Sequence, residues 1–141
     1  LESLGYEGLP VYKSPDYIEN AEEEFPFAMI TGARKLVYYH SRNKEFKRFR
    51  TAVPNGEVEM HPTNAAALGV KSGDRVKVTS KIGSIEIEVS VRHENEIMPG
   101  IIQITHGWRE ANVNMITHDD KFDPIDGFPL MKAVKVNIQK I

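Results

Sequence analysis

The sequence predicts a small, mostly-β barrel made of short strands and one or two short helices. The chain has 141 residues, which is the length of a single compact domain. Its composition, 40% hydrophobic and 27% charged, is that of an ordinary soluble globular chain rather than a disordered one. Short apolar runs alternate with polar residues at period two, and helical periodicity is confined to short segments. Together, these observations favour a barrel.

Residues 1–25 are predicted to be an acidic connector from a preceding domain, and residues 26–141 to form the folded domain. The first 24 residues hold seven acidic side chains and one lysine, so their net charge is −6. Pro10 and Pro15 interrupt the segment, and no apolar period persists in it. The chain also begins with Leu1 rather than methionine. We therefore expect a piece of a longer protein in which residues 1–24 are loosely attached.

The folded domain is predicted to begin with two strands and a helix. Phe27–Ile30 is a short apolar run that ends at a Thr-Gly pair, as a buried strand entering a loop does. Glu57–Met60 is the second predicted strand. Residues 61–69 are predicted to form a helix of about two turns, because a proline lies near the first turn, alanines fill the middle and a glycine ends it.

Period-two alternation predicts the remaining strands. Val76 and Val78 alternate with polar neighbours, and a turn through Gly83 reverses the chain into a strand with four apolar residues on one face. A turn at residues 98–100 precedes a strand at 101–105, and alternating apolar residues at 134–138 predict the last strand. The four apolar residues of the hairpin are Ile85, Ile87, Val89 and Val91.

The loop after the first strand is one candidate binding site. Glycine lets the backbone approach a ligand closely, and Arg34 and Arg42 are suited to gripping a phosphate. Residues 34–50 hold seven basic side chains against one acid, Glu45, and such a local excess attracts anions. The same residues fit a solvated polar loop, so both interpretations stay open here. The candidate residues are Thr31, Gly32, Arg34, His40, Ser41 and Arg42.

A long polar stretch at residues 105–127 is the other candidate site. It begins with Thr105-His106-Gly107-Trp108, directly after an apolar strand, and it is rich in Asn and Asp. Long loops in compact domains are commonly functional, and Asn and Asp side chains suit the amide-like edge of a heterocycle. Both residue types also form ordinary turns, so ligand recognition and simple turn formation remain two open interpretations.

The residue types exclude several kinds of site. The chain has no cysteine, which excludes disulfides, thiolate metal sites, iron–sulfur ligation and a cysteine nucleophile within it. Its five histidines show no pair at i, i+2 or i, i+4 spacing, so a helix-borne zinc site has no support. No run comes near the roughly 18 consecutive apolar residues of a membrane span.

Several motifs follow one another in a specific order across residues 26–138. They are the strand and loop ending in Thr31-Gly32-x-Arg34, then His40-Ser41-Arg42, the helix-turn-strand Met60-His61-Pro62-x-x-Ala65-x-x-Leu68-Gly69-Val70-x-x-Gly73-Asp74-x-Val76-x-Val78, the hairpin through Gly83, the turn Pro99-Gly100, Asn114-x-Ile116-Thr117, and Asp123-Pro124-x-x-Gly127-x-Pro129-x-x-Lys132. In this order, the motifs resemble the C-terminal domain of molybdopterin oxidoreductases of the dimethyl sulfoxide reductase type.

The resemblance implies a six-stranded double-psi β-barrel that binds molybdopterin guanine dinucleotide. The cofactor would be the bis form with Mo or W, held jointly with other domains of a parent oxidoreductase. The segment would supply neither a catalytic residue nor a metal ligand, and we expect it to be inactive alone. Ala33 stands where many members have arginine directly after the glycine. The implied cofactor contacts are Thr31, Gly32, Arg34, His40, Ser41 and Arg42 in the first loops and Asn114, Asp123 and Lys132 in the later ones.

The implied partners are the other domains of the parent and electron-transfer subunits, and a cytoplasmic location is favoured over a periplasmic one. The alternative is a stand-alone adaptor barrel, like the protein-binding N-terminal barrels of AAA ATPases, which would need exposed apolar anchors at residues 105–127. Nucleic-acid binding, suggested by the bases of 34–50, lacks a recognisable motif, and the aromatic residues there are typical of a core or an interface. We expect neither nucleic-acid nor membrane contact from this segment.

Overall fold

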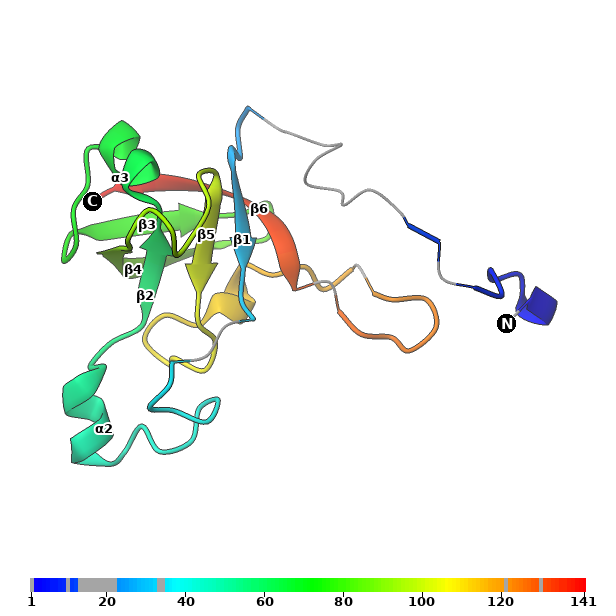
Figure 1. Ribbon diagram of the computed structural model, residues 1–141, viewed down its shortest axis with the longest axis horizontal. Helices are drawn as coiled ribbons and strands as arrows, with labels where there is room; N and C mark the ends of the chain where they lie inside the picture. Colours follow the sequence, from blue (N-terminus) through cyan, green and yellow to red (C-terminus); the bar gives the residue numbers. More distant parts are fainter. Residues whose placement is uncertain (1, 10, 13–22, 33–34, 121, 130) are drawn as a thin grey trace.

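The computed structural model describes residues 2–9, 11–12, 23–32, 35–120, 122–129 and 131–141. In this part of the chain, six strands close into one barrel in the order β1-β5-β2-β4-β3-β6 (Figure 1). The strands are β1 (Phe27–Ile30), β2 (Glu57–Met60), β3 (Arg75–Thr79), β4 (Ser84–Val91), β5 (Ile101–Ile104) and β6 (Lys132–Lys140). The mostly-β, six-stranded barrel predicted from the sequence is confirmed, including the closed form implied by the double-psi resemblance.

The strand pairing brings two loops together at one end of the barrel. β1 is parallel to β5, with Ile30 opposite Gln103, and β2 is parallel to β4. The other neighbours in the barrel are antiparallel. Because parallel strands end at the same edge, the loops that begin at Thr31 and Thr105 leave the barrel side by side.

The barrel interior is filled by the alternate residues of each strand. Met29, Met60, Ile102 and Ile104 are fully buried, and the inward residues of β3 and β4, from Val76 to Val89, are buried as well. Burying each such side chain contributes about 1.5–3 kcal/mol, so the alternation read from the sequence largely determines which face of each strand points inward.

Helix α3 (Pro62–Leu68) is the helix predicted at residues 61–69. His61 caps it, because its Nδ1 accepts a hydrogen bond from the Thr63 backbone N–H at 3.0 Å. Asn64 ties the helix to the turn before β5, since its Oδ1 accepts from Gly100 N–H at 3.0 Å and its Nδ2 donates to the Ile101 carbonyl at 3.3 Å. These contacts fix α3 against the start of β5.

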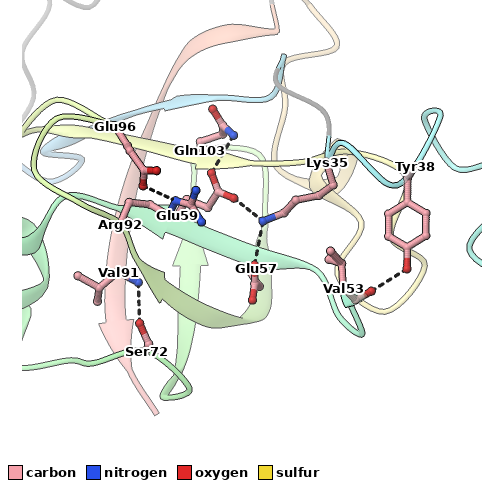
Figure 2. Close-up of polar contacts among 10 residues, drawn as sticks. All are labelled: Lys35, Tyr38, Val53, Glu57, Glu59, Ser72, Val91, Arg92, Glu96 and Gln103. Carbon is pink, nitrogen blue, oxygen red and sulfur yellow. Dashed lines mark hydrogen bonds and ion pairs between the residues drawn. The ribbon is translucent and has the colours of Figure 1, made fainter. Parts of the chain in front are cut away.

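Helix α2 (Lys47–Ala52) lies in the basic stretch and was not predicted. It has only six residues and buries none of them, and its N-cap residue Phe46 makes no side-chain hydrogen bond, so it offers neither an apolar period nor a capping signal. The chain after it is held in place where the Tyr38 hydroxyl donates to the Val53 carbonyl at 2.7 Å (Figure 2).

Within the described ranges, no helix is both long and apolar enough to cross a bilayer.

Residues 2–9 and 11–12 of the acidic connector lie outside the barrel (Figure 1), whereas Phe25, at the end of the connector, is buried. The connector contains a short 3-10 helix, η1 (Glu2–Leu4), whose residues are exposed. Tyr6 donates its hydroxyl to the Pro124 carbonyl at 3.1 Å, and this exposed bond links the connector to the polar stretch. The division of the chain near residue 25 stays a prediction, as does the loose attachment of residues 1–24.

Candidate functional site

The loops that follow β1 and β5 meet through two histidines. His40 Nδ1 lies 2.7 Å from His106 Nε2, and His106 Nδ1 lies 3.3 Å from the Thr31 carbonyl oxygen. Thr31 itself is buried, and its hydroxyl donates to the Met131 carbonyl at 3.2 Å. The structure therefore places two residues predicted from the sequence, Thr31 and His40, on either side of His106.

The hydrogen-bond chain determines the tautomers of the neutral histidine pair. A carbonyl oxygen only accepts, so His106 Nδ1 donates to Thr31 and His106 Nε2 accepts from His40 Nδ1. His40 also has a positive φ of 55°, an unusual conformation for a residue other than glycine. Residues in such conformations concentrate at functional sites, where the surrounding contacts hold them.

Ser41 packs directly on the second loop. Gly107 has a φ of +86°, and a Cβ on it would lie 3.2 Å from the Ser41 Cα and backbone nitrogen. A side chain on Gly107 would crowd Ser41, so glycine favours this close approach of the two backbones. Ser41 is exposed, so its hydroxyl is accessible at the meeting point of the two loops.

A buried lysine lies beneath this meeting point. Lys44 is 7% exposed, its Nζ donates to the Gly107 carbonyl, and the ammonium lies 3.7 Å from the centre of the Trp108 ring. Tyr38 packs edge-on against Trp108, with ring centroids 5.6 Å apart. Burial lowers the pKa of Lys44 to about 8, with Glu110 opposing the shift and Arg50 adding to it.

A cavity of about 660 Å³ opens between α2 and the loop after β5. Arg50 pairs with Glu110 at 2.8 Å on its wall, and the Arg50 guanidinium lies 5.4 Å from the centre of the Trp108 ring. The lining also includes residues of both loops and of α2. It consists of Ser41, Lys44, Glu45, Lys47, Arg50, Thr51, Gly107, Arg109 and Glu110.

A second lysine anchors the first loop to the barrel wall (Figure 2). Lys35 Nζ donates to Glu57 at 2.9 Å and to Glu59, and Gln103 Nε2 donates to Glu59 at 2.9 Å. The Lys35 side chain is 15% exposed. Burial alone would lower the pKa of Lys35, but the hydrogen bonds to Glu59 and Glu57 outweigh it and raise the pKa above its ordinary value.

The remaining predicted site residues have different surroundings. Gly32 and Arg42 are exposed, and the Arg42 guanidinium lies 6.0 Å from the centre of the Tyr39 ring. The Arg34 prediction falls outside the described residues, and Lys132 is described only as a backbone position paired with Ile30. These four predicted cofactor contacts, like the other five, therefore remain predictions.

The later-loop candidates contact their own segments. Asn114 lies in the 3-10 helix η2 (Val113–Met115), where its backbone N–H donates to the Asn112 side chain at 3.2 Å. The Asp123 carboxylate accepts from the backbone N–H groups of Ile125 and Asp126, and these bonds hold the pKa of Asp123 below its ordinary value. For Asp123, the structure thus shows the turn-forming role that the sequence had left open.

Several residues of the site were not assigned from the sequence. His106 and Gly107 were noted only as the start of the polar stretch, and Lys44 and Lys35 only as members of the basic stretch. Their roles were hard to predict, because a lysine that is buried against a tryptophan and a lysine that is solvated look the same in the sequence. Among the described residues, no cluster of three or more His, Asp or Glu could hold a metal ion.

The low pKa of Lys44 predicts a pH dependence of stability. A lysine whose folded pKa is about 8, against an ordinary 10.5, is protonated more often in the unfolded chain between these values. The free energy of unfolding should therefore rise with pH from about 8 to 10.5, by about 1–3 kcal/mol. Urea unfolding of the chain at pH 7.5, 8.5 and 9.5 measures this rise. It should vanish in Lys44→Met and persist in Lys77→Met, which removes an exposed lysine of β3; an equal rise in both variants would contradict the assignment.

Comparisons with known proteins agree on one family. The family model described as "Molydopterin dinucleotide binding domain" matches residues 27–135. A formate dehydrogenase alpha subunit of Methanococcus maripaludis is 29% identical over 92% of this chain and 19% of the relative. Dopamine dehydroxylase of Eggerthella lenta is 28% identical over 94% of this chain and 14% of the relative.

The fold comparison gives a similar result. The solved structure of acetylene hydratase from Pelobacter acetylenicus matches with a TM-score of 0.87 and 26% identity, over 99% of this chain and 22% of that chain. The chain spans less than a fifth of the length of the two curated relatives named above. Each of these proteins is therefore much longer than the segment that it shares with this chain.

Proposed function

Because the chain belongs to the molybdopterin dinucleotide-binding domain family, we propose that it binds part of a molybdopterin guanine dinucleotide, in the bis form with Mo or W, within a larger oxidoreductase. The observation that carries the proposal is the meeting of the loops after β1 and β5 at His40 and His106. The bound metal centre would supply the redox chemistry, and this chain would bind and orient the dinucleotide.

The residues at the meeting point fit such a ligand chemically. His40 and His106 meet through their ring nitrogens, and imidazole nitrogens donate and accept hydrogen bonds, which suits the N–H and carbonyl groups of a pterin or a guanine. The exposed Ser41 hydroxyl both donates and accepts, and the nearby lysines and arginines suit the diphosphate. Thr31, Gly32, Arg34, Arg42, Asn114, Asp123 and Lys132 are proposed as further contacts.

The partners that we propose are the other domains of the parent enzyme and its electron-transfer subunits. Exposed apolar side chains on the polar stretch and just after it support a protein partner, because such groups are usually covered in an assembled protein. They also keep the adaptor as the second candidate function. We propose that the segment is inactive alone and that the parent is cytoplasmic. The exposed side chains are Met115, Phe122, Ile125 and Phe128.

Guanosine diphosphate is the probe that tests the proposed function. We expect it to bind the 141-residue chain weakly, with a dissociation constant on the order of 1 mM, because other domains would supply much of the site. Amide chemical-shift changes in NMR spectra should concentrate at Thr31, His40, Ser41 and His106. They should decrease with added salt, since exposed charges are screened over about 10 Å at 0.1 M.

A matched pair of histidine variants provides the control. His40→Asn should weaken guanosine diphosphate binding about tenfold, because asparagine tolerates the positive φ but removes the imidazole. His93→Asn changes an exposed histidine beyond β4 and should leave the affinity unchanged. Chemical-shift changes confined to α3 and the β3–β4 hairpin would contradict the proposed position of the site. No binding at millimolar nucleotide would favour the adaptor.

A further inference from the structure

We propose that the cavity between α2 and residues 107–110 is a phosphate-binding site. It adjoins the meeting point of the two loops, and it shares Ser41 and Gly107 with that point. The inference rests on the proposed function where the phosphate is the diphosphate of the bound dinucleotide. A free phosphate would use the same chemistry, and the experiment below separates the two sources.

The charges on the cavity wall are unbalanced. Four cationic side chains and two acidic ones line it. Glu110 is already paired with Arg50 at 2.8 Å, so it neutralises one of the four cations. The ion pairs found among the described residues include neither Lys47 nor Arg109. The wall thus has a net positive charge with at least two cations available to an anion.

Lys44 provides the strongest indication of an anion. Lys44 is 7% exposed. Its ammonium donates a hydrogen bond to the Gly107 carbonyl and lies over the rings of Trp108 and Tyr38. No carboxylate in the described part of the chain pairs with it. Burying a charge without an opposite charge is unfavourable, and an anion in the cavity would compensate for it. Burial depresses the pKa of Lys44, and the charge of Glu110 offsets this only in part.

The shape and polarity of the cavity favour a phosphate group on a larger molecule. Ammonium and guanidinium groups together suit the several oxygens of a phosphate, and hydroxyls such as that of Ser41 add hydrogen bonds. The volume of about 660 Å³ is in the range of small-molecule sites and exceeds what a single ion needs. Because Ser41 is next to His40 in the chain, a nucleotide held at His40 can extend its phosphates into this cavity.

The experiment titrates the 141-residue chain separately with inorganic phosphate, guanosine and guanosine diphosphate. Trp108 is the chain's one tryptophan and packs beneath Lys44, so its fluorescence reports on the cavity, and NMR amide shifts locate each ligand. Phosphate should change the fluorescence and shift the amides of Lys47 and Arg109, which line the cavity and lie outside the meeting point of the two loops. Guanosine should shift His40 and His106 without the cavity amides, and guanosine diphosphate should shift both sets.

Charge variants decide whether the cavity residues bind the phosphate. The double variant Lys47→Gln with Arg109→Gln should weaken phosphate and guanosine diphosphate binding about tenfold or more, because it removes two charge-assisted hydrogen-bond donors. The control double variant Lys77→Gln with Arg75→Gln, on the outer face of β3, should leave both affinities unchanged. All four residues are exposed, so we expect the variants to fold.

The outcomes separate this inference from the proposed function. Phosphate binding in the cavity without any guanosine diphosphate binding at His40 would support the anion site for free phosphate and contradict the dinucleotide proposal. If guanosine diphosphate binds at His40 and the Lys47 and Arg109 changes do not weaken it, the anion site is overturned. The proposed function is then left standing. Equal weakening in the cavity and control variants would show only general charge attraction and would also overturn it.

Discussion

Lys35→Met should destabilise the fold by about 2–3 kcal/mol at neutral pH, because it leaves two carboxylates of the barrel wall without their shared cation. The Lys35 ammonium donates to both Glu57 and Glu59, whose side chains are 26% and 11% exposed. Removing one partner of a fully buried pair costs about 3–5 kcal/mol, and the partial exposure here reduces that value. Urea unfolding followed by circular dichroism measures the change.

The control for this prediction is Lys77→Met, at an exposed position of β3, which should change stability by less than about 0.5 kcal/mol. Adding Glu59→Gln to Lys35→Met should recover part of the loss, since it removes one uncompensated charge. The raised pKa means that the Lys35 contribution is full below 10.5 and is lost as pH rises through the folded pKa. A loss in Lys35→Met no larger than in Lys77→Met would show that the network contributes little.

Gly107→Ala should be still more damaging, with a loss of about 2–5 kcal/mol and weakened binding of guanosine diphosphate. A positive φ costs a residue other than glycine about 1–2 kcal/mol. The added Cβ would also lie 3.2 Å from the backbone of Ser41, and such overpacking costs about 1–3 kcal/mol. Because Ser41 has to move, the site should be disturbed along with the fold. Thermal unfolding and the nucleotide titration measure the two effects.

Gly100→Ala is the matched control for this variant. Gly100 has a φ of +79°, close to that of Gly107, but nothing lies within 4 Å of an added Cβ. It should therefore lose only the conformational part, about 1–2 kcal/mol, and bind guanosine diphosphate as the unchanged chain does. If the two alanine variants lose equal stability and bind equally well, the close approach of Gly107 to Ser41 has no role in the site.

The strands were predictable because each depends mainly on its own residues. Val76, Val78 and Ile85 point inward in β3 and β4, as their alternation with polar neighbours predicts. Helix α3 was predictable from its proline and terminal glycine, although the cap made by His61 was not anticipated. Helix α2 escaped prediction because its six residues, three of them basic and none buried, resemble a solvated loop.

The sequence by itself determined the mostly-β barrel and, through the order of its motifs, the family and the first-loop candidates Thr31, His40 and Ser41. Only the tertiary structure decided that His106, 75 residues from Thr31 along the chain, lies between Thr31 and His40. It also decided that Lys44 is buried on Trp108 rather than solvated. The physical reason is that strand periodicity is a local property of the chain, whereas the parallel pairing of β1 with β5, which brings these loops together, depends on how distant strands close the barrel.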